Sequence, residues 1–197
     1  MYDQYLHAYE KLSLSTAGIV MGALLLVLHA LALAKPQATK AMLNGLSTNE
    51  KAARGLLTLD FAWLFLLILD ADWNPLCMNL FDFNNMRPYL LIACPIIWFV
   101  LYSRGKELLF PRALGFFLLL ACIVPLTAAF LKDPVSRLLI PCWCYPVLTV
   151  ALFWVGKPYL FRDWMEKYTA SPRLYTISNV IGAAWGAAIL LCAVCFW

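Results

Sequence analysis

Long apolar stretches, separated by short polar segments, fill most of this chain. A helix that crosses a membrane needs about 20 predominantly apolar residues. We therefore predict about six spans, of which the second and third have the shortest unbroken apolar runs. They cover residues 15–34, 56–72, 88–103, 112–131, 138–155 and 174–197. The predicted fold class is an all-α, polytopic transmembrane helix bundle, with residues 1–197 forming a single integral membrane domain and no soluble domain.

The segment between the fifth and sixth spans has the pattern of an amphipathic helix. Its apolar side chains would share one helix face and its charged side chains the other, a pattern typical of a helix lying flat in the headgroup region. The apolar face holds Leu160, Phe161, Trp164, Met165 and Tyr168, and the charged face holds Arg162, Asp163, Glu166 and Lys167. We predict such an interfacial helix over about 158–168, on the cytoplasmic side. The alternative is an extension of the fifth helix into water, against which Pro158 favours a break.

A capping signal predicts where the second predicted helix begins, ahead of its apolar run. Ser47-Thr48-Asn49-Glu50 has the S-x-x-E form of a capping box, in which two side chains satisfy free backbone N–H groups at a helix start. The helix would then run from Lys51 through the apolar residues to Asp70 or Asp72.

The composition excludes several classes of protein. The chain is 63% hydrophobic and 13% charged, with a mean hydropathy of +0.76. A soluble domain is about 45–50% apolar and about 25% charged, and a water-soluble fold of this size cannot bury so much apolar surface. A soluble enzyme, a disordered chain and a nucleic-acid-binding domain are therefore poor interpretations. The expected partner of the surface is the lipid bilayer, with no nucleic acid bound.

The distribution of basic residues predicts the orientation. With six spans, the segments 35–55, 103–112 and 156–173 share one side and carry most of the basic residues. They are Lys35, Lys40, Lys51, Arg54, Arg104, Lys106, Arg112, Lys157, Arg162, Lys167 and Arg173, against Lys11, Arg87, Lys132 and Arg137 on the other side. Because basic loops stay in the cytoplasm, we predict a bacterial-type inner-membrane protein with both termini outside.

Two ionisable residues inside the predicted spans form a candidate polar pair. His29 and Asp60 each lie about one turn from the cytoplasmic end of their spans. Ionisable groups inside a membrane are costly and often functional. We predict that the two side chains are hydrogen-bonded or bridged by one water. Two interpretations are open: a proton or cation site, and a structural pair.

Six of the seven cysteines fall toward the predicted outer side. Cys142 and Cys144 lie near the outer end of the fifth span, and Cys192 and Cys195 near the outer end of the sixth. They are candidate redox cysteines of a thiol–disulfide relay. Against this, Cys192 and Cys195 lie at a helix C-terminus. Redox-active cysteines favour a helix N-terminus, because the helix dipole there lowers the pKa of the thiol. The alternative is that these cysteines only pack as small hydrophobic residues.

Small residues at four-residue spacing mark two faces for helix packing. Gly18 and Gly22 lie in the first span, and Gly182 and Gly186 in the sixth. Such steps allow two helix backbones to approach closely in a membrane. The first and sixth helices would pack against each other, or these faces would bind another subunit.

The outer segment 70–87 is rich in oxygen ligands. Asp70, Asp72, Asp82 and Asn84 are the type of ligand that calcium prefers. However, the spacing matches no calcium-binding loop. A solvated acidic loop and a contact surface for a partner are the other interpretations, and no metal site or cofactor is predicted.

No catalytic motif accompanies these features. The chain has no nucleophile–base arrangement, phosphate-binding glycine loop or HExxH segment. Its small size, short loops and glycine faces favour a non-catalytic subunit, assembly factor or scaffold of a larger membrane complex, bound to other membrane protein subunits. The alternatives are a membrane thiol–disulfide oxidoreductase that uses the outer cysteines, and a small transporter or channel that uses His29 and Asp60.

Overall fold

The computed structural model describes all residues except 1–8, 10–11, 72–73, 75, 79 and 105–108. Every regular element in the described part is helical, which confirms the predicted all-α helical bundle. The helices are α1 (Leu14–Ala34), α2 (Pro36–Thr48), α3 (Glu50–Ile68), α4 (Arg87–Arg104), α5 (Leu109–Ala129), α6 (Leu139–Gly156), α7 (Tyr159–Ala170) and α8 (Pro172–Cys195), with short 3-10 helices η3 (Phe81–Met86) and η4 (Val135–Leu138) before α4 and α6.

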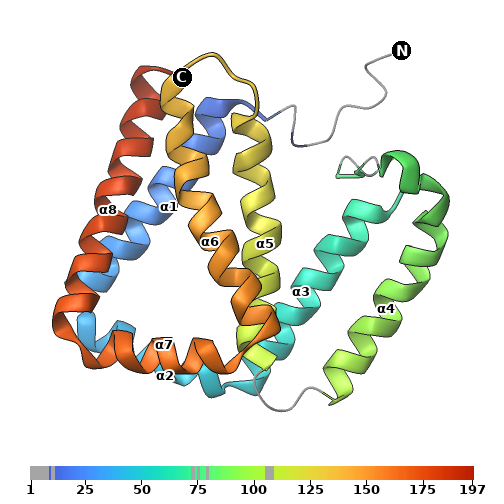
Figure 1. The fold of residues 1–197 in the computed structure, drawn as a ribbon, viewed down its shortest axis with the longest axis horizontal. Helices are drawn as coiled ribbons and strands as arrows, with labels where there is room; N and C mark the ends of the chain where they lie inside the picture. Colours follow the sequence, from blue (N-terminus) through green and yellow to red (C-terminus); the bar gives the residue numbers. More distant parts are fainter. Residues whose placement is uncertain (1–8, 10–11, 72–73, 75, 79, 105–108) are drawn as a thin grey trace.

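Five stretches of helix are long and apolar enough to cross a membrane, as expected of an integral membrane protein. They are Leu14–Ala34, Asp82–Ser103, Leu109–Ala129, Val135–Gly156 and Pro172–Cys195. Helix α3, the second predicted span, is not among them, because Lys51, Arg54 and Asp60 interrupt its apolar character. It nevertheless runs alongside α4 (Figure 1). The second predicted span, over residues 56–72, therefore stays a prediction.

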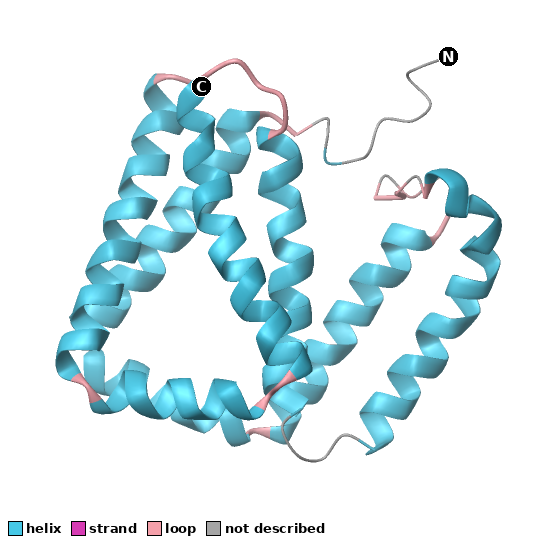
Figure 2. Ribbon diagram, in the orientation of Figure 1, coloured by secondary structure: helices cyan, strands magenta, loops and turns pink. Residues whose placement is uncertain are grey.

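The helices form two groups of different compactness. Helices α1 and α8 have the most extensive contact, followed by α5 with α6 and α3 with α5. Helix α4 packs mainly against α3, and the α3–α4 pair leans away from the other long helices (Figure 1). Helices α2 and α7 lie across one end of the structure, at the opposite end from the C-terminus (Figures 1 and 2).

Proline residues create the bends that lay α2 and α7 across the bundle. The residue before a proline is pushed out of the α-helical region. Lys35 before Pro36 has φ −131° and ψ 63°, and Lys157 before Pro158 has φ −131° and ψ 74°. Helix α6 thus ends at Gly156 instead of continuing through Pro158, as the sequence predicted. The sequence analysis treated the segment 35–55 as a connection between two spans and missed helix α2 within it.

The amphipathic pattern of α7 determines which of its faces is covered. Phe161, Met165 and Tyr168 are buried, whereas the four charged side chains are exposed. Trp164 is half-exposed, with its ring stacked on that of Tyr168 at 5.0 Å. The apolar face therefore packs onto the bundle. Lys40 of α2 donates a hydrogen bond to the carbonyl oxygen of Thr169 in α7, at 2.7 Å, which links the two helices.

The start of α3 differs from the prediction. Its N-cap is Asn49, whose side-chain oxygen accepts hydrogen bonds from the backbone N–H groups of Lys51 and Ala52. The predicted capping box beginning at Ser47 is wrong, because Ser47 and Thr48 are already the last residues of α2. Asparagine is a strong N-cap in its own right, and it separates two helices that follow each other directly.

Glycines allow α1 and α8 to approach almost backbone to backbone. A Cβ atom added at Gly22 would lie 2.8 Å from the backbone nitrogen of Leu190, and one added at Gly186 would lie 2.7 Å from that of Leu26. A Cβ at Gly18 would meet the ring of Trp197 and one at Gly182 the ring of His29. The structure thus places all four glycines of the two small-residue faces inside the α1–α8 contact.

Replacing Gly186 with alanine is expected to destabilise the protein by about 1–3 kcal/mol, as overpacking of a tight contact does. The new methyl group meets backbone, which cannot move as a flexible side chain can. Thermal unfolding in detergent, followed by the reaction of the buried cysteines with a thiol-reactive dye, measures the effect.

Gly55 provides the matched control. It lies inside α3, and a Cβ added there has nothing within 4 Å. Gly55→Ala is expected to leave the melting temperature unchanged or raise it, because alanine is the better helix former by about 1 kcal/mol. Equal melting temperatures for the Gly186→Ala variant and the wild type would contradict the close α1–α8 contact.

Candidate functional site

A buried polar cluster in the bundle surrounds Asn179 of α8. This residue is buried, with an exposed fraction of 2%. Its side-chain oxygen lies 3.0 Å from Nδ1 of His29 in α1, and its side-chain nitrogen donates to the hydroxyl of Tyr168 in α7 and to the carbonyl oxygen of Tyr175, both at 2.7 Å. One amide therefore joins three helices.

These contacts also determine the tautomer of His29. The carbonyl of Tyr175 can only accept a hydrogen bond, so the Asn179 atom beside it is the NH₂ group and the other is the oxygen. That oxygen can only accept as well, so Nδ1 of His29 carries the proton. The opposite side of the His29 ring packs against Gly182, and Trp143 of α6 lies edge-on to the ring at 6.1 Å.

A second set of contacts extends this cluster to the polar end of the bundle. The hydroxyl of Tyr175 donates to the carbonyl oxygen of Ala32 near the end of α1, at 2.8 Å. The ammonium group of Lys40 lies 4.8 Å from the centre of the Tyr175 ring, an arrangement typical of a cation–π interaction. Tyr175 thus connects α1, α2 and α8, and the side chains of the cluster partner one another instead of facing an open site.

Asp60 lies elsewhere, on the buried face of α3. Its exposed fraction is 2%, and it shares that face with Ala53, Leu57 and Leu67. Neither carboxylate oxygen has a hydrogen-bond partner among the described residues. The predicted hydrogen bond between His29 and Asp60 is therefore wrong. The reason is that α1 packs on α8, which supplies Asn179 as the partner of His29, whereas α3 packs on α5 and α4.

No disulfide joins the candidate redox cysteines. All seven are free. Cys144 is buried and interacts with Cys122 of α5 in a cluster that includes Leu14 and Ile140, whereas Cys142 is exposed. The two side chains differ because residues two positions apart on a helix point in different directions. Cys192 is half-buried and Cys195 is exposed at the end of α8. The cysteine contact in the structure thus joins two helices by packing.

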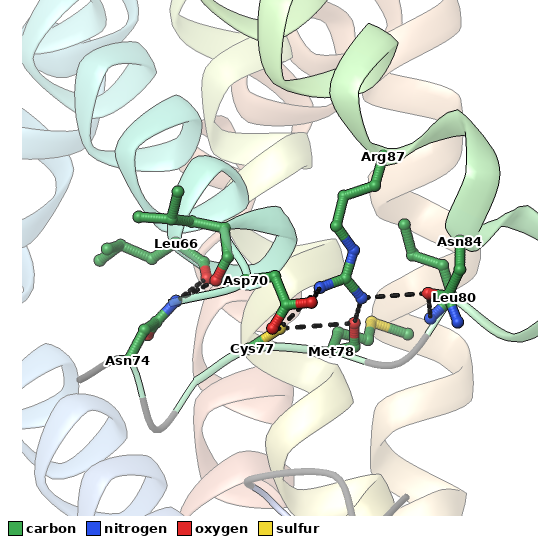
Figure 3. Close-up of polar contacts among 9 residues, drawn as sticks. Leu66, Asp70, Asn74, Cys77, Met78, Leu80, Asn84 and Arg87 are labelled. Atoms are coloured by element: carbon green, nitrogen blue, oxygen red, sulfur yellow. Dashed lines mark hydrogen bonds and ion pairs between the residues drawn. The ribbon is translucent and has the colours of Figure 1, made fainter. Parts of the chain in front are cut away.

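The acidic segment between α3 and α4 is organised by Arg87, as Figure 3 shows. Its guanidinium group lies 2.8 Å from a carboxylate oxygen of Asp70, and it donates to the carbonyl oxygen of Met78 at 2.9 Å and to the side chain of Asn84 at 3.1 Å. Asn74 donates to the carbonyl group of Leu66 in the last turn of α3 and to that of Leu69, the C-cap residue that follows the helix. Asn74 therefore caps the end of α3, and Asp70 and Asn84 are partners of the Arg87 guanidinium.

This pattern bears on the possibility of a cation site. Asp72 lies outside the described residues, and within them no group of three or more His, Cys, Asp or Glu side chains is placed to hold a metal ion. Asp70, a predicted oxygen ligand, points to the Arg87 guanidinium instead (Figure 3).

Sequence reasoning found His29 but missed Asn179, its hydrogen-bond partner, and the cluster around it. Asn179, Tyr168, Tyr175 and Lys40 form the cluster, and the sequence contained one signal for them. Asn179 is an amide in an apolar helix, three residues before Gly182 and on the same helix face. An amide in hydrocarbon needs partners from another helix.

No protein-family model matches this chain, and neither a curated protein nor a solved structure shows significant similarity to it. Arguments about its function therefore rest on its own residues.

Replacing Asn179 with leucine is expected to destabilise the fold by about 1–3 kcal/mol, because it leaves buried groups of His29 and Tyr168 without a partner. Thermal unfolding in detergent measures the loss. Ser178→Ala is the matched control, since the Ser178 hydroxyl bonds only to backbone carbonyls of its own helix. Equal losses for the two variants would show that the cluster contributes nothing beyond helix packing.

Proposed function

We propose that this protein is a non-catalytic subunit, assembly factor or scaffold of a larger membrane complex, and that it binds a partner membrane subunit through α4. One observation carries the proposal: the isolation of α4 from the rest of the bundle. Only 6% of its most apolar stretch is buried, compared with 17–28% in the other four helices of membrane-spanning length.

One face of α4 is suited to this contact. Tyr89, Ile92, Ile96 and Phe99 follow one another at spacings of three and four residues and therefore share one side of the helix. Each has more than half of its surface exposed. Cys94 and Trp98, which contact α3, lie on a different side. We call the four exposed residues the α4 stripe.

The physical reason for a partner lies in how helices associate in lipid. Lipid chains are as apolar as leucine, so helices are held together by close packing and by hydrogen bonds between them. Among the described side chains, two such bonds join α3 and α4, from Trp98 to Thr58 at 3.2 Å and from the Cys94 thiol to the carbonyl of Phe61 at 3.7 Å. A partner helix on the α4 stripe would supply packing that the chain itself does not provide.

We further infer that the protein lies in a bacterial-type inner membrane with both termini outside. The eleven basic residues on one side against four on the other support this orientation. Helices α2 and α7, which contain Lys40, Arg162 and Lys167, lie together at one end of the bundle (Figure 1). Their amphipathic faces suit the headgroup region of the cytoplasmic leaflet.

The α4 stripe gives the test of partner binding. Replacing Ile92, Ile96 and Phe99 together with alanine is expected to reduce the yield of the native complex by about tenfold or more, because the three side chains supply the contact area. Affinity purification in a mild detergent, followed by native electrophoresis, compares complex size and yield between the variant and the wild type.

The matched control uses lipid-facing residues of α1. Leu24, Val27 and Leu31 are exposed to a similar degree and share one face of a well-packed helix. Their triple alanine variant should form the complex as the wild type does. A wild-type protein that purifies alone, or a complex lost equally in both variants, would argue against a scaffold role for α4.

Reporter fusions test the orientation separately. Alkaline phosphatase, which folds only outside the cytoplasm, is expected to be active when joined after Trp197 and inactive when inserted at Gly45 in α2. The opposite activities would contradict the predicted topology, and activity at both sites would show that an even number of spans separates them, instead of the predicted five.

A further inference from the structure

A narrow apolar groove runs between α3 and α4, on the side of α4 away from the α4 stripe. Its volume is about 200 Å³, and it is lined by Thr58, Phe61, Ala62, Phe65, Cys94, Pro95 and Trp98. Apart from the Thr58 hydroxyl, the Cys94 thiol and the Trp98 N–H group, these side chains are hydrocarbon. Thr58 donates to the carbonyl of Arg54, and Trp98 donates to Thr58, so the polar groups of the lining are already paired.

A cation lies beyond one end of this groove, next to its lining residues Thr58 and Trp98. Arg54 lies one turn before Thr58 on α3, and its guanidinium carbon lies 5.3 Å from the centre of the Tyr102 ring on α4. Tyr102 in turn packs on Trp98, with the ring centres 5.2 Å apart. The charged group thus lies at the end of the groove that faces the basic segments, and the apolar lining leads away from it.

The guanidinium of Arg54 retains capacity for a ligand. Its ion-pair contact with Glu50 is 3.5 Å long, and the Glu50 side chain is more than half exposed. The Nε atom is buried and has no hydrogen-bond partner among the described residues. A guanidinium has five N–H donors, and its planar geometry matches the oxygens of a phosphate. Because the Arg54 side chain is 35% exposed while its Nε is buried, an anionic oxygen group would meet the terminal N–H groups of the guanidinium.

The dimensions of the groove favour a lipid chain over a helix. From Arg54 to Phe65, α3 rises about 16 Å, close to the thickness of one leaflet of a hydrocarbon core about 30 Å thick. A helix about 10 Å in diameter would fill on the order of 1,200 Å³ over that length. A single acyl chain is thin enough to enter a groove of about 200 Å³.

We propose that this groove binds an anionic phospholipid of the cytoplasmic leaflet, with its phosphate on Arg54 and one acyl chain along Ala62 and Phe65. The binding goes beyond the proposed scaffold role and does not depend on it, because the site is formed within one chain. A lipid chain here would fill the space between the two helices of the weakly packed α3–α4 pair and hold them at a constant separation.

Native mass spectrometry of the full chain in detergent tests the proposal, with phosphatidylglycerol and phosphatidylcholine of identical acyl chains as probes. The wild type is expected to retain phosphatidylglycerol about fivefold more than phosphatidylcholine, the effect of one basic residue near an anionic headgroup. Arg54→Gln should remove this preference while chain binding persists. Arg162→Gln, a change at an exposed basic residue of α7, should leave it intact.

The groove itself is tested by filling it. Ala62→Phe is expected to lower retention of both lipids, whereas Leu59→Phe, on an exposed side of α3 outside the groove, should not. If Ala62→Phe fails to fold, phosphatidylglycerol with brominated chains gives the same information. It should quench tryptophan fluorescence in the wild type more than in Trp98→Phe.

Three results would overturn the proposal. The first is equal retention of the two lipids by the wild type, and the second is an unchanged preference in Arg54→Gln. The third is displacement of phosphatidylglycerol by inorganic phosphate, which would show that the headgroup binds without the groove. None of these measurements requires a partner subunit, so failure of the lipid site and failure of the scaffold role are distinguishable.

Discussion

The close contact between α1 and α8 is the interaction on which the rest of the bundle depends. In lipid there is no hydrophobic force to bring two apolar helices together, so they associate where their backbones come close enough for dense packing. Gly22 and Gly186 provide that approach near the middle of both helices, where a single added methyl group would meet backbone atoms. The contact joins the first and last long helices of the chain and so closes the bundle.

The polar cluster follows from that contact. Once α8 lies against α1, Asn179 reaches His29 on one side and Tyr168 on the other. The amide thereby links α7, which lies across the end of the bundle, to α1 and α8. Tyr175 and Lys40 add α2 to the same assembly. Two amphipathic helices that would otherwise be held only by lipid are thus attached to the bundle by hydrogen bonds.

The α3–α4 pair is built differently, and its properties explain why both proposals concern it. It contains the buried carboxylate of Asp60, which has no partner in the described part of the chain, and the buried Nε of Arg54, which has none either. Helix α4 contributes little buried surface to the bundle. The buried Asn179 between α1 and α8 has hydrogen-bond partners, whereas Asp60 and Arg54 have buried polar atoms without one among the described residues. A region of this kind gains most from a bound lipid or a neighbouring subunit.

The sequence by itself determined the helical membrane fold, because hydropathy and helix length are local properties that the bilayer imposes on every span. It also determined the amphipathic face of α7 and the break at Pro158, since both depend on neighbouring residues. Only the tertiary structure decided that His29 pairs with Asn179, 150 positions away, and that Asp60 does not join them. Residues 36–48 and the Asn49 cap were missed because a short helix of low hydrophobicity is stabilised by contacts such as that of Lys40 with α7. Which helices touch is set by side-chain volume and backbone approach across the bundle, and no local pattern in the chain contains that information.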